Sequence, residues 1–146
     1  MPRIVREADV TWEGTVSRGS GVVRASSSGA FELPITIASR AGDPQGKTSP
    51  EELLAAAHAS CFAMALSGGL ARGGTPPNRL EVRARVTFDK VGDSWTVVSS
   101  ELEVTGDVPG ADAAKFGHAA EGAKENCPVS RAFKGNVKLS VKATLS

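Results

Sequence analysis

The chain has 146 residues, of which 40% are hydrophobic and 23% charged, with a net charge of +1 at pH 7. This length predicts one domain over residues 1–146, large enough to bury a core without disulfide staples. Its lysines and arginines are scattered, which argues against nucleic-acid binding. Its start is charged and lacks the apolar core of a signal peptide, so we expect a cytoplasmic protein without a lasting structural disulfide.

The first forty residues have the pattern of three strands. DVTWEGTVS alternates in part and ends at the turn RGSG, and GVVRAS follows before a second turn at SSG. AFELPITIAS predicts a third strand that ends at Arg40, before a polar loop over residues 41–48. Pro34 has no N–H to donate to a strand neighbour, which predicts an edge strand or a bulge at that place.

The stretch SPEELLAAAHASCFAMALS, residues 49–67, predicts a long helix. Ser49 is a suitable N-cap and Glu52 completes a capping box, while one of the two glycine pairs further on should end the helix. Residues 53–71 carry no charge and are long enough to span a membrane. Their high alanine content and several polar residues favour instead a central helix that is buried on nearly all sides.

The second half of the chain predicts a hairpin, a helix and a final strand. RLEVRARVTFDK and SWTVVSSELEVTGDV alternate well and are joined by VGD. Asp112 is a plausible cap for a second helix, which Pro128 breaks or restarts, and NVKLSVKATL alternates strongly. The order of three strands, a helix, two strands, a helix and a strand predicts an α+β fold with mainly antiparallel pairing.

Two cysteines are the candidates for chemistry. Cys61 lies in the middle of the long helix, where a cysteine is most often a small buried hydrophobe. His58 lies one turn earlier on the same face, and an imidazole in a packed helix needs a partner. Cys127 precedes a proline and is expected to begin a short helical turn, whose N–H groups favour a thiolate. From these residues alone, either thiol could be the nucleophile.

Charged residues near the long helix could support a thiolate. Glu51 lies ten residues before Cys61, a separation of about 15 Å along the helix and about 80° around it. It could therefore act on the thiol only through another residue, or from a second copy of the helix packed antiparallel. Arg40 or Arg18 could supply a fixed positive charge, although either could also be an ordinary surface arginine.

The sequence SPEELLAAAHASCFAMAL, followed about sixty residues later by NCPVS, resembles the OsmC/Ohr family of organic hydroperoxide peroxidases. TWEGTVSRGSG and VTFDKVGD extend this resemblance over nearly the whole chain, and His58 in AAHASC is closer to the OsmC branch. The resemblance implies an OsmC-like α+β fold with antiparallel sheets packed around two long central helices. It also implies an intertwined homodimer with active sites at the subunit interface.

The resemblance further implies a role for each candidate residue. Cys61 is expected to be the peroxidatic thiol and Cys127 the resolving thiol that forms a disulfide with it. Glu51 is expected to hold an arginine that stabilises the Cys61 thiolate, Arg40 by likeness to OsmC or Arg18 by likeness to Ohr, of which we favour Arg40. The implied activity is reduction of organic hydroperoxides to alcohols in oxidative-stress defence, with a dithiol reductant, for which lipoyl-type dithiols are the candidates, and no metal or organic cofactor.

Two other functions use the same residues. A non-enzymatic redox sensor would form the same disulfide without turnover. A zinc-binding module would use His58, Cys61, Cys127 and His118 as ligands, although the chain has no C-x-x-C pair.

Overall fold

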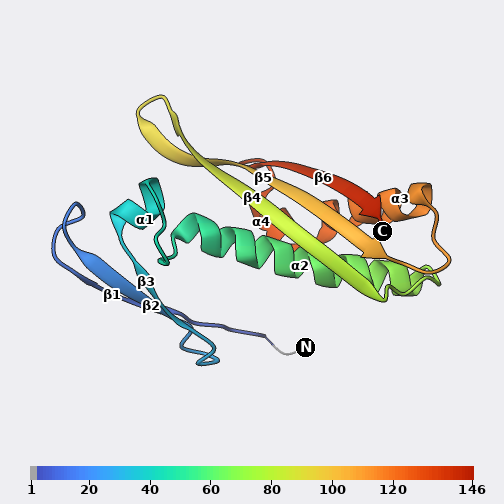
Figure 1. Ribbon diagram of the computed structural model, residues 1–146, viewed down its shortest axis with the longest axis horizontal. Helices are drawn as coiled ribbons and strands as arrows, with labels where there is room; N and C mark the ends of the chain where they lie inside the picture. Colours follow the sequence, from blue (N-terminus) through green and yellow to red (C-terminus); the bar gives the residue numbers. More distant parts are fainter. Residues whose placement is uncertain (1–2) are drawn as a thin grey trace. The chain divides into compact units, whose positions relative to one another are not determined.

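The computed structural model describes residues 3–146, which form two compact units that meet in the sequence at Leu53 and Leu54 (Figure 1). The first contains β1 (Asp9–Glu13), β2 (Ser20–Arg24), β3 (Glu32–Ile35) and the short helix α1 (Ile37–Ala41). The long helix α2 (Pro50–Arg72) has its first turn in this unit and the rest in the second. The second unit continues with β4 (Arg79–Val91), β5 (Ser94–Asp107), α3 (Ala113–Asn126), α4 (Pro128–Phe133) and β6 (Lys138–Leu145). The predicted α+β class is confirmed.

The first unit is an antiparallel sheet in the order β1-β2-β3, followed by α1. Pro34 lies in β3, an edge strand as predicted. The prediction that this strand runs on to Arg40 was wrong. Thr36 Oγ1 accepts a hydrogen bond from Ser39 N and Ser39 Oγ accepts one from Thr36 N, both at 3.0 Å, and this reciprocal cap starts α1. Arg40 therefore lies in the last turn of a helix.

The ends of α2 agree largely with the sequence pattern. Ser49 Oγ accepts a hydrogen bond from Glu52 N at 3.2 Å, as an N-cap should. The Glu52 carboxylate differs from the expected capping box, since it accepts a hydrogen bond from Thr48 Oγ1 at 2.7 Å. The helix ends at Arg72, before the second glycine pair, where Gly74 adopts a φ of 89° that favours glycine.

Burial along α2 follows one stripe. The buried side chains recur at every fourth residue, at His58, Phe62, Leu66 and Leu70. The opposite side is open, and Met64 is 71% exposed. The prediction that α2 is buried on nearly all sides is therefore wrong for a single chain, because only 22% of the most apolar 18-residue stretch of the helix is buried. By length and composition α2 could cross a membrane, but the core helix of a soluble protein passes the same test.

The second unit is a sheet in the order β4-β5-β6. The predicted hairpin is confirmed, with β4 and β5 antiparallel and joined at Gly92 and Asp93. The pairing of β5 with β6 is parallel, which the expectation of mainly antiparallel pairing did not include. The connection from β5 to β6 passes through α3 and α4, and a helical crossover of this kind places the next strand parallel to its neighbour.

The core of the second unit lies between its helices and the sheet (Figure 1). Phe62 of α2, Leu102 of β5 and Phe116 of α3 are among its fully buried side chains. The contact between α3 and β5 is close, because a Cβ on Gly106 would lie only 2.6 Å from the Phe116 ring. Cys127 is also fully buried and belongs to this core, so its surroundings are fixed by packing.

Candidate active site

The structure brings the two cysteines together. Cys61 is half-buried in the middle of α2, and Cys127 is fully buried at the point where α3 ends and α4 begins. Both are reduced thiols, and their side chains are in hydrogen-bonding contact. Two thiols in contact can exchange a proton, and an oxidant that takes up two electrons can join them in a disulfide, so this pair is the centre of the candidate site.

Backbone N–H groups in the first turn of α4 donate hydrogen bonds to both sulfur atoms. Cys127 is the N-cap of α4, as its position before Pro128 predicted, and its Sγ accepts a hydrogen bond from Ser130 N at 3.3 Å. The neighbouring N–H of Val129 donates to Cys61 Sγ. Backbone N–H groups that lack a helical partner stabilise negative charge, so one short turn can support a thiolate at either cysteine.

The surroundings of Cys61 act on its pKa in opposite directions. Burial raises the pKa of the Cys61 thiol, because the thiolate loses hydration. The Val129 N–H lowers this pKa, and the adjacent Cys127 raises it through its hydrogen bond and its like charge. The balance within the chain is a raised pKa, so a reactive thiolate at Cys61 requires a further positive charge.

His58 is the fully buried centre of a hydrogen-bond chain that ends at Cys127. Its Nδ1 lies 2.6 Å from Ser100 Oγ, and its Nε2 lies 2.8 Å from Ser130 Oγ. Ser130 Oγ in turn lies 3.0 Å from Cys127 Sγ, while the ring of Phe133 packs edge-on against the imidazole at 5.2 Å. Burial lowers the pKa of His58, which keeps the imidazole neutral near pH 7.

The sequence predicted that His58 needs a partner but not which residues provide it. A signal for Ser130 was present, since it stands three residues after the N-cap Cys127, where an N3 side chain faces the cap. Ser100 carried no comparable signal. It is fully buried on β5, forty-two residues away from His58 in the sequence, and only the tertiary fold brings the two together.

Arg40 is the arginine that pairs with Glu51. Arg40 Nε lies 3.0 Å from Glu51 Oε1, and Arg40 Nη2 lies 2.9 Å from Oε2, a bidentate pair. The Glu51 side chain is 10% exposed and that of Arg40 36% exposed. The hydrogen bonds and the charge of Glu51 raise the pKa of Arg40, although burial opposes this. Arg18 instead lies exposed in the turn between β1 and β2.

A cavity of about 290 Å³ lies beside Arg40 in the first unit. Its walls are mostly apolar and include Trp12, Val16, Ile35 and Ile37. A cavity that combines apolar walls with one guanidinium suits a small molecule with an alkyl part and an electron-rich oxygen.

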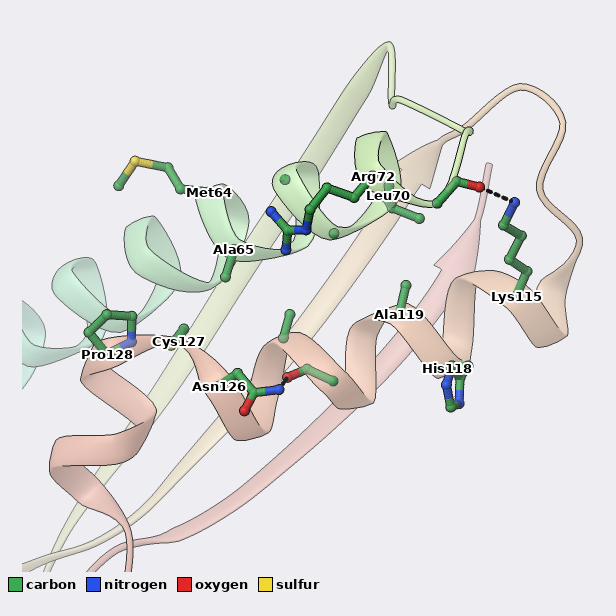
Figure 2. A pocket seen from close by; sticks show the side chains of 15 residues that line it. Met64, Ala65, Leu70, Arg72, Lys115, His118, Ala119, Asn126, Cys127 and Pro128 are labelled. Carbon is green, nitrogen blue, oxygen red and sulfur yellow. Dashed lines mark hydrogen bonds between the residues drawn. The ribbon is translucent and has the colours of Figure 1, made fainter.

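A second cavity, of about 480 Å³, lies between α2 and α3 in the second unit (Figure 2). Cys127 and Pro128 lie at one end of it, and Arg72 and Lys115 lie toward the other. Lys115 Nζ donates a hydrogen bond to Gly73 O at 3.0 Å across this far end. The cavity reaches the buried Cys127 from the side of α3.

The zinc hypothesis is not supported by the arrangement of its four ligands. Within residues 3–146, no group of three or more His, Cys, Asp or Glu side chains could hold a metal ion. Both ring nitrogens of His58 are engaged by serine hydroxyls, and His118 lies exposed on α3, at the cavity of Figure 2.

The fold and the contact between two reduced thiols are typical of proteins that carry out thiol redox chemistry. Comparison with known proteins identifies the family. The model of the family described as OsmC-like protein matches residues 42–142, more than half of the chain. Peroxiredoxin OsmC of Escherichia coli (strain K12) is 37% identical over 136 residues, which cover 93% of this chain and 94% of that protein. The chain therefore belongs to the OsmC-like protein family, and the predicted resemblance is confirmed.

Two further relatives extend the likeness to the organic hydroperoxide resistance proteins. The one from Xanthomonas axonopodis pv. citri (strain 306) is 27% identical over 133 residues, which cover 90% of this chain and 92% of that protein. The crystal structure of OhrB of Bacillus subtilis, an organic hydroperoxide resistance protein, matches with a TM-score of 0.75 at 26% identity. That match covers 94% of this chain and 98% of the other, which confirms the OsmC-like fold.

Proposed function

We propose that the chain is a thiol-dependent peroxidase that reduces organic hydroperoxides to alcohols in oxidative-stress defence in the cytoplasm. The observation that carries this proposal is the contact between the reduced thiols of Cys61 and Cys127. The names of the relatives support it, since one is called a peroxiredoxin and two are called organic hydroperoxide resistance proteins.

In the first step the Cys61 thiolate attacks the O–O bond of the hydroperoxide. One oxygen stays on sulfur as a sulfenic acid, and the other leaves with the organic group as an alcohol after taking up a proton. The assignment of this role to Cys61 is supported by its partial exposure, because a substrate can reach it more easily than the fully buried Cys127. The N–H of Val129 stabilises the attacking thiolate.

Arg40 is the proposed source of the positive charge that Cys61 requires. It lowers the energy of the thiolate and of the negative oxygen that leaves, while Glu51 orients its guanidinium. The bidentate pair supports this role, since it fixes both the position and the plane of the guanidinium. The apolar cavity beside Arg40 accommodates the organic part of the substrate and favours alkyl hydroperoxides over hydrogen peroxide.

A homodimer is part of the proposal. Glu51 and Cys61 are about 15 Å apart along α2, so the ion pair would act on a thiol across the interface between two copies. Apolar side chains that are exposed in one chain support such an interface. They include Met64 on α2, 71% exposed, and Val10 on β1, 56% exposed. Covering large exposed apolar side chains is the ordinary driving force for association.

In the second step Cys127 attacks the Cys61 sulfenic acid, and a disulfide forms with loss of water. The contact between the two side chains supports this step, because little movement is needed to join the sulfur atoms. A dithiol reductant, proposed to be of lipoyl type, reopens the disulfide by thiol–disulfide exchange. These steps use no metal or organic cofactor.

The test is a count of free thiols and an intact mass after one equivalent of tert-butyl hydroperoxide, without reductant. Wild type is expected to release one equivalent of alcohol and lose both thiols. Cys127→Ser is expected to stop at a sulfenic or overoxidised Cys61, and Cys61→Ser should not react. Hydrogen peroxide in parallel measures the preference for organic substrates.

The outcomes separate this function from its alternative. Survival of both thiols in wild type would overturn the peroxidase. Formation of the disulfide, without continued consumption of hydroperoxide when a dithiol such as dihydrolipoamide is added, would favour a non-enzymatic redox sensor.

A further inference from the structure

His58 is a buried titratable group that the proposed mechanism does not use. It lies in the α2 stripe with Phe62 and Leu66, where an apolar side chain would fill the same space without the cost of desolvating two nitrogen atoms. Both nitrogens are satisfied, by Ser100 on β5 and by Ser130 on α4. These two hydrogen bonds would be sufficient for a purely structural histidine. The contact that a structural role does not explain is the one from Ser130 to the thiol of Cys127.

We propose that His58, acting through the Ser130 hydroxyl, accepts the thiol proton of Cys127 when Cys127 attacks oxidised Cys61. Ser130 Oγ lies 2.8 Å from His58 Nε2 and 3.0 Å from Cys127 Sγ, so one hydroxyl bridges the base and the nucleophile. Ser130 contacts the reacting sulfur, whereas His58 is a positioning residue that acts through it. This inference rests on the proposed function, because it concerns the second step of that cycle.

The relay requires one order of donors and acceptors along these contacts. In that order His58 Nδ1–H donates to Ser100 Oγ, Nε2 accepts the Ser130 O–H, and Ser130 Oγ accepts the Cys127 S–H. The backbone N–H of Ser130 also donates to Cys127 Sγ and stabilises negative charge there as the proton leaves.

The step balances without an external oxidant or reductant. An S–S bond forms between Cys127 and Cys61, and the S–O bond of the sulfenic acid breaks. The Cys127 sulfur is oxidised, the Cys61 sulfur is reduced, and hydroxide leaves from Cys61. The thiol proton passes to Ser130 as the Ser130 proton passes to His58. Return of that proton from the imidazolium to the hydroxide or to solvent gives one water in total.

The surroundings of the imidazole suit a proton acceptor that is neutral at rest. The imidazole interacts with the hydroxyls of Ser100 and Ser130 and with the ring of Phe133, and the titratable groups joined to it through Ser130 are the thiol of Cys127 and, in contact with that thiol, Cys61. Burial alone is the cause that lowers the pKa of His58, so no charged side chain among the described residues holds it protonated. The imidazole therefore has one unprotonated nitrogen, which can accept a proton, at neutral pH.

The first measurement isolates the attack by Cys127 and does not depend on peroxide. Ellman's reagent converts Cys61, the more exposed thiol, to a mixed disulfide and releases one equivalent of coloured thionitrobenzoate. Release of a second equivalent reports attack by Cys127 on this mixed disulfide. Ser130→Ala is expected to slow this release by at least about tenfold, which is less than the roughly hundredfold minimum typical of acid–base groups because the Ser130 N–H contact to Cys127 remains. Ser130→Thr keeps the hydroxyl and should restore the rate, and Cys127→Ser should release no second equivalent.

The pH profile of this release distinguishes proton transfer from simple packing. In wild type the rate is expected to fall only at a pH clearly below the ordinary imidazole pKa of 6.5, because burial lowers the pKa of His58 and the ring stops accepting protons only below that lowered value. His58→Gln should lose this dependence together with the faster rate. Phe133→Leu alters packing against the same ring and should keep the dependence. Equal rates and profiles in wild type, Ser130→Ala and His58→Gln would overturn the inference.

A third measurement needs no variant of the hydrogen-bond chain. Nitrogen-15 NMR of the imidazoles reads the tautomer directly, and His118→Gln assigns the signals because the chain has two histidines. The expected result is a neutral His58 with its proton on Nδ1. A proton on Nε2 would make that atom a donor to Ser130 and would overturn the relay.

With peroxide as oxidant, Ser130→Ala should release alcohol at the wild-type rate but form the disulfide slowly. If wild type fails to react with peroxide, the peroxidase fails while the first three readouts still decide the inference.

Discussion

At the scale of single residues, the Arg40 guanidinium balances a carboxylate that is almost wholly shielded from water. Removing it in Arg40→Ala leaves Glu51, 10% exposed, without its bidentate partner. We expect the free energy of unfolding to fall by about 1–2 kcal/mol, less than for a fully buried pair because Arg40 itself is 36% exposed. Urea titration measures this.

The same variant separates the proposed role of Arg40 from that of the exposed Arg18. Oxidation of Cys61 by tert-butyl hydroperoxide should slow by at least about tenfold in Arg40→Ala, as expected when a group that stabilises developing charge is lost. Arg18→Ala should leave both stability and rate near wild type. If Arg18→Ala slowed the oxidation of Cys61 and Arg40→Ala did not, the role in the proposed mechanism would belong to Arg18.

His58 should give the stability of the protein a recognisable pH dependence. Burial lowers its pKa from the ordinary value of 6.5, so below about pH 6.5 the unfolded chain takes up a proton that the folded chain does not. The free energy of unfolding therefore falls as the pH falls from 6.5 toward the lowered folded-state value, by at most about 1.4 kcal/mol per pH unit. His58→Gln should flatten this window in urea titrations at several pH values. His118→Gln, at an exposed position, should keep the wild-type slope.

At the scale of elements, α1 is a helix of five residues that carries Arg40. A helix this short depends on its caps, since it has too few internal hydrogen bonds to form alone. Thr36→Ala removes the hydroxyl that accepts from Ser39 N and should cost about 1 kcal/mol. Thr36→Ser keeps the hydroxyl and should remain near wild type. If Arg40 has its proposed role, Thr36→Ala should also slow oxidation of Cys61 by hydroperoxide, measured in the same samples.

The contact between α3 and β5 offers a paired test with two glycines. A Cβ at Gly106 on β5 would lie 2.6 Å from the Phe116 ring, so Gly106→Ala should overpack the core and cost about 1–3 kcal/mol. At Gly117 on α3, next in sequence to Phe116, a Cβ would meet nothing within 4 Å. Gly117→Ala should therefore stabilise the protein by about 0.5–1 kcal/mol through its helix propensity. Thermal unfolding followed by circular dichroism would show opposite shifts. Equal effects would mean that α3 does not pack closely on β5.

At the scale of the whole molecule, the parts that the sequence predicted are those that local patterns determine. The α2 cap at Ser49, the hairpin around Gly92 and the cap of α4 at Cys127 follow from turn and capping chemistry. The start of α1 was missed although it too is local, because a cap formed by Thr36 and Ser39 competes with a strand pattern over the same residues.

The parts that the sequence could not predict depend on contacts between distant segments. Ser100 meets His58 only after β5 packs against α2, and no periodicity marks a serine on a buried strand face as a hydrogen-bond partner. The parallel pairing of β5 with β6 also depends on the path that the chain takes through α3 and α4. The choice of Arg40 over Arg18 followed from family resemblance, and the structure supplies the ion pair with Glu51.

The open side of α2 makes a prediction about the assembly. Ala57, Ser60 and Met64 are exposed on a helix that has no charge from Leu53 to Ala71, and a surface of small uncharged side chains permits another helix to approach closely. We expect light scattering to give twice the chain mass of 15.0 kDa. A glutamate in such an interface would be buried without a partner, so Ala57→Glu should shift the protein toward monomer.

Dissociation should also remove activity, because in the proposed mechanism the Arg40–Glu51 pair acts on Cys61 across the interface. In Ala57→Glu the rate of Cys61 oxidation by organic hydroperoxide should therefore fall in proportion to the fraction of monomer. Raising the protein concentration should restore both the dimer and the rate. Ala114→Glu places the same charge on an exposed alanine of α3, where the helix N-terminus favours it, and should remain a fully active dimer. A fully active Ala57→Glu monomer would show that one chain supplies the whole site, and would remove the dimer from the mechanism.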